Sequence, residues 1–359
     1  MKNWRLHSIF ILLLVLSSCS SKDEGYEPVQ PVGPTALELQ VPQIFSDNLL
    51  APLIPNDNPQ TVEGVALGKR LFFDRILSSD NSVACARCHV PRKSFTDNAQ
   101  FSAGVNGTLG SRNSMPLFNL AWNFSERFAW DGKELSLERQ ALEPVQNPVE
   151  MHSNWEDVVV RLQNHSEYPD LFEGAFSTST ITTELVTKAI AQFERTLISA
   201  NSKFDRVTLG QEELTPQEQN GLNVFMDEAR GDCFHCHGSP NNPLWTDNAF
   251  HNNGLDSEFT DLGLGAVTGD PADSGKFRSP SLRNLSFTAP YMHDGRFATL
   301  EEVINHYSEG LQPSATIDPL MKKVDEGGVQ LSDQDKADLL AFLLTLNDQS
   351  FMDNPDFQN

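Results

Sequence analysis

Two short cysteine motifs constrain this chain more than any other feature. Cys85-Ala-Arg-Cys88-His89 and Cys233-Phe-His-Cys236-His237 both follow the pattern C-x-x-C-H. This pattern is typical of c-type haem attachment, in which both cysteines form thioethers and the histidine binds the iron. The chain has only five cysteines, so chance is a poor explanation for two such motifs. The sequence therefore predicts two covalently bound c-type haems, with His89 and His237 as iron ligands.

The fifth cysteine, Cys19, follows a short charged and apolar leader. Residues 1–18 carry Lys2 and Arg5 before the apolar run from Ile9 to Leu16, which is the pattern of a signal peptide. Leu16-Ser-Ser-Cys19 resembles a bacterial lipobox; the alternative is an ordinary signal peptide with an incidental cysteine. We expect an exported protein that is lipid-anchored through Cys19 in the cell envelope of a Gram-negative bacterium, facing the periplasm or the exterior. No other stretch is long and apolar enough to predict a transmembrane helix.

Composition suggests a tether followed by two domains. Residues 19–55 are rich in Pro, Asp, Glu and Asn, which predicts a flexible tether. We expect a first haem domain over 56–206 and a second over 207–350. The net charge of −23 argues against nucleic acid as a partner, and it suits either a basic electron donor or simple solubility.

Weak internal similarity supports a duplicated, mainly α-helical fold. Gly68–Asp74 and Gly221–Asp227 each precede one cysteine motif and read as the end of a helix. Thr215, Pro216 and Glu218 form a helix-start pattern. Further helices are expected over 184–199 and, after a cap at Ser332, over 335–346. The fold class is therefore two cytochrome c-like haem domains in tandem, with long loops.

Several further motifs, in the right order and spacing, resemble the bacterial di-haem cytochrome c peroxidase family, which includes MauG. They run from about Gly64 to Leu346. The segments are Phe128-Ala-Trp-Asp-Gly132, Pro144-Val-Gln-Asn-Pro-Val-Glu-Met151, Lys276-Phe-Arg-Ser-Pro-Ser-Leu-Arg-Asn284 and Ala289-Pro-Tyr-Met-His-Asp-Gly295.

The resemblance implies that the first haem is the peroxidatic one. Glu150 matches the family's distal acid–base residue and Gln140 its distal glutamine, while Pro144 would shape the distal wall. A carboxylate above the iron can take a proton from one peroxide oxygen and deliver it to the other. Trp130 matches the tryptophan that lies between the haems, where an indole can relay an electron, although a bare aromatic is also ordinary core packing.

One departure from the family pattern concerns the first haem. Reductively activated members carry a blocking histidine sixteen residues beyond the first motif, where this chain has Val105. No histidine occurs between His89 and His152. We therefore expect a first haem that is open to peroxide in the oxidised state, as in MauG.

The sixth ligand of the second haem has two candidates. The family position, fourteen residues after His293, is Tyr307, which is the MauG pattern. Met292 is the rival, because thioether ligation is common in cytochromes c. His293 itself is expected to be structural or to contact a haem propionate.

The resemblance also implies one calcium ion between the haem domains. Its ligands match Asn113 by side chain, and Thr288 and Pro290 by backbone carbonyl. Such oxygen ligands, completed by water, suit Ca²⁺.

These expectations favour a cytochrome-c peroxidase that reduces hydrogen peroxide with electrons from a small c-type cytochrome or similar periplasmic redox protein. A MauG-like oxidase, which would oxidise a protein or small molecule at a distance, is the alternative within enzymes. A non-catalytic di-haem electron carrier is the alternative of another class, but it has no need of Glu150 and Gln140. Homodimers are common in the family, so a dimer is possible here by analogy.

Overall fold

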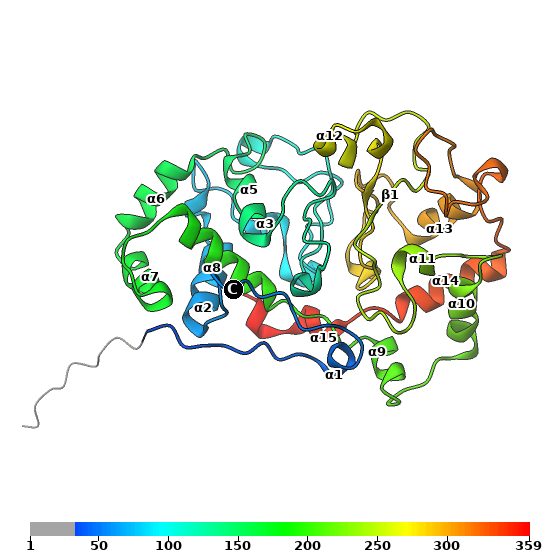
Figure 1. Cartoon of the computed structure of the whole chain (residues 1–359), viewed down its shortest axis with the longest axis horizontal. Coiled ribbons are helices and arrows are strands. Elements are labelled where there is room, and N and C mark those ends of the chain that lie inside the picture. Colours follow the sequence, from blue (N-terminus) through cyan, green and yellow to red (C-terminus); the bar gives the residue numbers. More distant parts are fainter. Residues whose placement is uncertain (1–32) are drawn as a thin grey trace, which may run out of the picture. The chain divides into compact units, whose positions relative to one another are not determined.

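The computed structural model describes residues 33–359. The predicted signal peptide, Cys19 and the first part of the tether lie outside the described residues. The described part of the chain forms one compact unit, in which helical elements gather into two lobes (Figure 1). We define the first lobe by helices α2 to α8 and the second by α9 to α14.

Helices make up nearly all of the regular structure. The α-helices are α1 (Gln43–Ser46), α2 (Val62–Phe73), α3 (Cys85–Cys88), α4 (Leu137–Gln140), α5 (Glu143–Gln146), α6 (Trp155–Gln163), α7 (Tyr168–Phe176), α8 (Thr183–Arg195), α9 (Lys203–Thr208), α10 (Pro216–Met226), α11 (Phe234–His237), α12 (Leu264–Thr268), α13 (Leu300–Glu309), α14 (Asp333–Leu344) and α15 (Gln349–Asp353). The 3₁₀ helices are η1 (Arg75–Leu77), η2 (Pro91–Lys93), η3 (Val105–Gly107), η4 (Leu120–Trp122), η5 (Pro271–Asp273), η6 (Leu285–Phe287), η7 (Val324–Glu326) and η8 (Pro355–Phe357). The strands β1 (Phe250–His251) and β2 (Phe277–Arg278) pair antiparallel, with Phe250 opposite Arg278. The predicted mainly α-helical fold is confirmed.

Each lobe is built on a pair of closely packed helices, α2 with α8 and α10 with α14. A Cβ atom on Gly68 of α2 would lie 1.9 Å from the carbonyl oxygen of Ala189 in α8. A Cβ atom on Gly221 of α10 would likewise lie 1.9 Å from the carbonyl oxygen of Asp338 in α14. The two glycines therefore let the backbones touch at equivalent places, as expected for a duplicated unit.

The predicted helix starts have clear physical causes. Thr215 and Glu218 form a capping box with each other's backbone N–H groups, and Pro216 opens α10. The side chain of Ser332 accepts a hydrogen bond from the backbone of Asp335 and caps α14. The helix predicted over 184–199 begins one residue earlier and ends at Arg195.

The described part of the tether predicted over residues 19–55 carries apolar side chains that are buried, and the tether itself stays a prediction. Ile44 and Phe45 of α1 are buried. Phe45 packs edge-on against Trp122, with ring centroids 4.9 Å apart. These few apolar residues, within a mostly polar stretch, are enough to hold the segment against the folded unit.

The two lobes are joined at more than one place. The boundary predicted between residues 206 and 207 falls inside α9, and Phe204 of α9 packs against Trp245 and Phe342 of the second lobe; the boundary itself stays a prediction. At the other end, α15 leaves the second lobe and returns to the first (Figure 1). Its Phe351 joins the first lobe's core beside Phe95 and Phe118.

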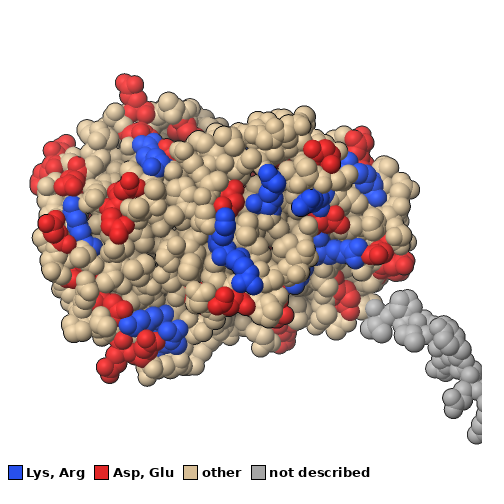
Figure 2. Space-filling model, turned by 180° about the vertical axis from the view of Figure 1, so that it is seen from behind, with Lys and Arg blue, Asp and Glu red and all other residues tan. Residues whose placement is uncertain are grey.

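Acidic and basic side chains are interspersed over the face shown in Figure 2. The excess of negative charge is therefore not gathered into one extended patch on this face.

Candidate functional site

The first cysteine motif forms a single helical turn, α3, that ends at His89. The His89 Nδ1–H donates to the carbonyl oxygen of Phe95 at 2.9 Å, which leaves Nε2 free to bind a metal. Burial lowers the pKa of His89, which favours the neutral imidazole that a metal requires. Ser114 secures the turn by donating to the carbonyl oxygen of Cys88 at 2.8 Å.

The second motif is held in the same way. Ser279 donates to the carbonyl oxygen of Cys236 at 3.1 Å, which matches the bond from Ser114 in the first lobe. Burial lowers the pKa of His237 to about 4. Cys85, Cys88, Cys233 and Cys236 are all free of disulfides, so their sulfur atoms are available for thioether bonds.

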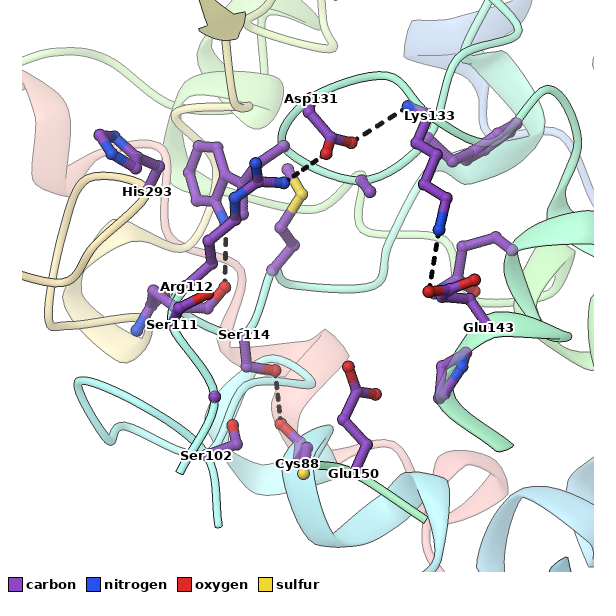
Figure 3. A pocket seen from close by; sticks show the side chains of 18 of the residues that line it. Cys88, Ser102, Ser111, Arg112, Ser114, Asp131, Lys133, Glu143, Glu150 and His293 are labelled. Atoms are coloured by element: carbon purple, nitrogen blue, oxygen red, sulfur yellow. Dashed lines mark hydrogen bonds and ion pairs between the residues drawn. The ribbon is translucent and has the colours of Figure 1, made fainter. Parts of the chain in front are cut away.

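A cavity of about 940 Å³ opens beside the first motif. The structure brings the predicted catalytic side chains to it: Glu150, Gln140 and Trp130 line the same cavity as Cys85 and His89. Figure 3 shows the carboxyl group of Glu150 extending into the cavity above Cys88. Pro144, from the start of α5, also lies in the wall.

Glu150 is oriented by its own loop. Asn147 donates from Nδ2 to Oε1 of Glu150 at 2.8 Å, so the second carboxylate oxygen is free to face the cavity. Burial, and then the negative charge of Glu143, raise the pKa of Glu150, while the bond from Asn147 and the charge of Lys133 oppose this. Such a raised pKa suits a carboxyl group that must both take and give a proton.

Trp130 lies where the two lobes meet. Its indole Nε1–H donates to the carbonyl oxygen of Asn113 at 2.8 Å. Its own carbonyl oxygen accepts from the backbone N–H of Arg278, which belongs to the second lobe, at 2.9 Å. The indole is buried, and it is therefore fixed in relation to both lobes.

The two candidate ligands of the second haem lie close together. Asn253 Nδ2 donates to the phenol oxygen of Tyr307 at 3.0 Å and approaches the sulfur of Met292 at 3.6 Å. Burial raises the pKa of Tyr307 to about 12, and the bond from Asn253 opposes this rise. The choice between Tyr307 and Met292 stays open.

His293 has an aromatic neighbour. Its ring stacks on Phe277 with centroids 3.6 Å apart and planes 10° apart, and both residues line the cavity. Burial lowers the pKa of His293. Its predicted contact with a propionate stays a prediction.

The predicted calcium ligands lie in two segments, around Asn113 and around Thr288. Both segments are hydrogen-bonded to the loop that contains Asn98 and Ala99. Asn113 donates from Nδ2 to the carbonyl oxygen of Ala99, which leaves its own side-chain oxygen for a cation. Asn98 donates to the carbonyl oxygens of Phe287 and Ala289, on either side of Thr288. Residues 33–359 contain no group of three or more His, Cys, Asp or Glu side chains that could hold a metal, whereas Asn113, Thr288 and Pro290 would offer amide and carbonyl oxygens. The calcium site stays a prediction.

One feature of the cavity that fits a bound haem is the buried guanidinium of Arg278, which could pair with a haem propionate. Arg278 lines the cavity, and its Nε has no hydrogen-bond partner within the described chain. Burial lowers the pKa of Arg278 to about 10. Among the described residues, its Nη2 approaches only the sulfur of Met115, at 3.7 Å. A buried guanidinium without a carboxylate partner is costly, and a haem propionate would supply that carboxylate.

Sequence reasoning missed the residues that hold the site together. Asn147 lies in the same segment as Glu150 and contacts it locally, whereas the roles of Asn253 and Arg278 depend on contacts across loops. Aligning the two halves on Ser114 and Ser279 would have drawn attention to Arg278, because that alignment pairs it with Asn113.

No helix within residues 33–359 meets the length and hydropathy needed to cross a bilayer.

Comparisons with known proteins agree with this site. Residues 62–213 match the family model described as di-haem cytochrome c peroxidase. The chain is 36% identical to the methylamine utilization protein MauG of Methylophilus methylotrophus, over 84% of this chain and 86% of that protein. It is 34% identical to the cytochrome-c peroxidase IdrP1 of Pseudomonas sp. strain SCT, over 85% of this chain and 88% of that protein.

A solved structure of a MauG-like protein associated with microbial copper homeostasis superimposes with a TM-score of 0.80 at 35% identity. The match covers 90% of this chain and 99% of that one. With relatives this similar over most of its length and a haem-attachment motif in each lobe, this chain belongs to the oxidoreductases of the di-haem cytochrome c peroxidase and MauG family.

Proposed function

We propose that this protein reduces hydrogen peroxide to water at the first haem site, with electrons that enter at the second haem from a small c-type cytochrome. The observation that carries the proposal is the carboxyl group of Glu150, which extends into the cavity that Cys85, Cys88 and His89 line. A protein that only carried electrons would need no such buried acid–base group beside an iron site.

Glu150 and Gln140 divide the proton chemistry between them. A bound c-type haem would supply the redox-active iron at which peroxide accepts two electrons. Glu150 takes a proton from one peroxide oxygen and returns it to the other, so that the O–O bond breaks with water as the leaving group. Gln140 orients the peroxide through its amide without competing for the proton. Two further protons from solvent complete the formation of two waters.

The surroundings of Val105 support an oxidised resting state that is already open. The backbone N–H of Val105 donates to the carbonyl oxygen of Glu150 at 2.7 Å, and the Val105 side chain is buried in the first lobe's core. A Cβ atom on the preceding Gly104 would lie 2.1 Å from the carbonyl oxygen of Val149. This loop is therefore packed against the distal segment, and its residue 105 carries an apolar side chain that has no atom able to bind iron.

Electrons would pass between the haems by way of Trp130. Its indole is hydrogen-bonded to the first lobe and its backbone to the second. His237 would hold the second iron on one side, with Tyr307 as the proposed ligand on the other.

The test is peroxide consumption by the holoprotein with a reduced small cytochrome c. Glu150→Gln keeps the size of the side chain but removes the base, and we expect the rate to fall by about 10²- to 10⁴-fold. Glu156→Gln, which changes an exposed carboxylate, is the matched control and should leave the rate unchanged. A Glu150→Gln variant with the full rate would exclude this acid–base role. The resting ferric protein should show one high-spin and one low-spin haem, whereas two low-spin haems would favour an electron carrier.

A second candidate is a MauG-like oxidase, and the position of Tyr307 favours it. The hydrogen bond from Asn253 to the half-buried phenol oxygen favours a phenolate against the opposing effect of burial, and a phenolate ligand would stabilise ferric and higher oxidation states. If both haems stay oxidised above the ferric state after peroxide is added, with no electron donor present, this would support this candidate over the ordinary peroxidase.

A further inference from the structure

Arg112 joins the Trp130 loop to the second lobe. Its Nη1 lies 2.6 Å from Oδ2 of Asp131, the residue that follows Trp130. On its other side, Nε and Nη2 bind the two carboxylate oxygens of Asp261 at 2.7 and 2.9 Å. Asp261 belongs to a loop of the second lobe. One guanidinium therefore contacts both lobes beside Trp130, and Figure 3 shows its contact with Asp131.

The same short segment also holds the indole itself. Asn113, next to Arg112, accepts the hydrogen bond from Trp130 Nε1. Residues 112 and 113 thus contact the Trp130 loop twice, once at the ring nitrogen and once at the carboxylate of Asp131. The first contact holds the indole nitrogen, and the second holds the loop that carries the indole.

Around Trp130 the two lobes are related by an approximate two-fold symmetry, in which residues of one lobe have equivalents in the other. Arg112 has no charged equivalent. The backbone N–H of Asn113 donates to the carbonyl oxygen of His293 at 2.7 Å, and that of Arg278 donates to the carbonyl oxygen of Trp130 at 2.9 Å. These reciprocal bonds pair Asn113 with Arg278 and Trp130 with His293. The partner of Arg112 in this relation is Phe277, whose ring lies beneath the guanidinium at 5.8 Å. The first lobe therefore has a cation where the second lobe has an aromatic ring.

The resulting cluster carries one positive and two negative charges in a half-buried place. The exposed fractions of the Arg112, Asp131 and Asp261 side chains are 25%, 12% and 28%. Burial disfavours the charged guanidinium, but the two carboxylates outweigh burial and raise the pKa of Arg112 overall. The cluster is thus net negative beside the indole, which favours a positive charge on an oxidised Trp130.

We propose that Arg112 is a positioning residue for electron transfer through Trp130, holding the indole in place and keeping Asp131 and Asp261 together beside it. The inference rests on the proposed relay through Trp130 and adds to it a residue that contacts neither peroxide nor iron. Without the guanidinium, the two carboxylates repel each other and the Trp130 loop loses its side-chain link to Asp261, while the backbone bonds of Arg278 and Asn113 remain.

The test is electron paramagnetic resonance of the ferric holoprotein before and after one equivalent of hydrogen peroxide. Loss of the low-spin signal reports removal of an electron from the second haem. The wild type should lose the high-spin and low-spin signals together. Arg112→Gln and Trp130→Phe should lose the high-spin signal at once but the low-spin signal at least about tenfold more slowly, a rate ratio that corresponds to about 1.4 kcal/mol in the barrier. Arg112→Lys, which keeps the charge but loses the forked geometry, should lie between them.

Lys188→Gln is the matched control, because Lys188 also bridges two carboxylates, at 3.2 Å from Asp57 and 2.6 Å from Glu184, but does not line the cavity. It should leave both signals as in the wild type. If Arg112→Gln lowers the melting temperature yet loses both signals as fast as the wild type, Arg112 is only structural and the inference fails while the relay stands. If the wild type itself keeps its low-spin signal, the relay through Trp130 fails and this inference fails with it.

Discussion

The pKa of Glu150 depends on a few polar and charged neighbours. Glu150 receives one hydrogen bond from Asn147, and its pKa is raised first by burial and then by the charge of Glu143. Lys133 binds Glu143 at 2.8 Å at the edge of the cavity and acts in the opposite direction on Glu150. The protonation of Glu150 therefore depends on an ion pair that is itself half exposed.

Glu143→Gln should shift the pH dependence of the peroxide reaction. Glu150 must be deprotonated to act as a base, so the rate rises with pH through its pKa. Removing the like charge of Glu143 lowers that pKa, and the rising limb should move to lower pH. Stopped-flow rates of the peroxide reaction across the acidic range measure this. Lys133→Gln is the control, because removing this positive charge should raise the pKa of Glu150 and move the rising limb to higher pH. Shifts of both variants in the same direction would contradict the assignment of the limb to Glu150.

Tyr307 and Met292 can be separated by a pair of substitutions. We expect Tyr307→Phe to change the low-spin resonance of the second haem, and Met292→Leu to leave it unchanged, because a half-buried phenol with a donor at its oxygen is suited to ferric iron. Electron paramagnetic resonance of the ferric holoprotein measures both. Tyr307→Met should also raise the potential of the second haem, since a thioether stabilises the ferrous state. The reverse pattern would assign the ligand to Met292.

Whole elements are held by backbone contact between helices. Gly68 and Gly221 permit the close approach of α2 to α8 and of α10 to α14. These glycines lie inside helices, where glycine costs stability relative to alanine. Close packing of the paired helices offsets this local cost.

Gly221→Ala should destabilise the second lobe by about 1–3 kcal/mol, the usual range for overpacking. The new methyl group would meet the carbonyl oxygen of Asp338, which is backbone and cannot rotate away. Gly174→Ala in α7 is the matched control, because nothing lies within 4 Å of its added Cβ; it should be neutral or stabilising by up to about 1 kcal/mol. Denaturant unfolding of both holoproteins measures the difference, and equal effects would refute the close-approach argument.

At the scale of the whole molecule, the C-terminal segment links the lobes. Asp348 accepts from the backbone N–H groups of Ala200 and Asn201, while its other oxygen accepts from Phe351 N–H. This anchors the start of α15 beside the segment that leaves the first lobe. The rings of Phe351 and Phe357 then enter the core of the first lobe.

Phe351→Ala should therefore weaken the first lobe, although the residue lies at the far end of the chain. Phe351 is 3% exposed and lies 5.7 Å from Phe95 between ring centroids. We expect a loss of about 3–5 kcal/mol in unfolding free energy, seen by thermal or denaturant unfolding followed at the first haem. Phe124→Ala, at a ring that is 40% exposed, should change stability by less than about 0.5 kcal/mol. Comparable losses in the two variants would show that the tail does not support the first lobe.

The sequence by itself determined what depends on neighbours along the chain. The C-x-x-C-H motifs, the caps at Thr215 and Ser332 and the helix ends at Asp74 and Asp227 are local patterns, in which the chemistry of a few adjacent residues decides the outcome. The mainly α-helical fold followed from these patterns. For the polar stretch before residue 56, composition does not show that Ile44 and Phe45 pack against Trp122.

Only the tertiary structure decided how the site is assembled. Arg112 lies 19 residues from Asp131 and 149 from Asp261, and no local pattern relates the three. Asn253 meets Tyr307 across 54 residues. Such contacts depend on the way in which the long loops pack against one another. The free energy of these loop conformations is set by burial and by pairing of charges in three dimensions rather than by local propensity.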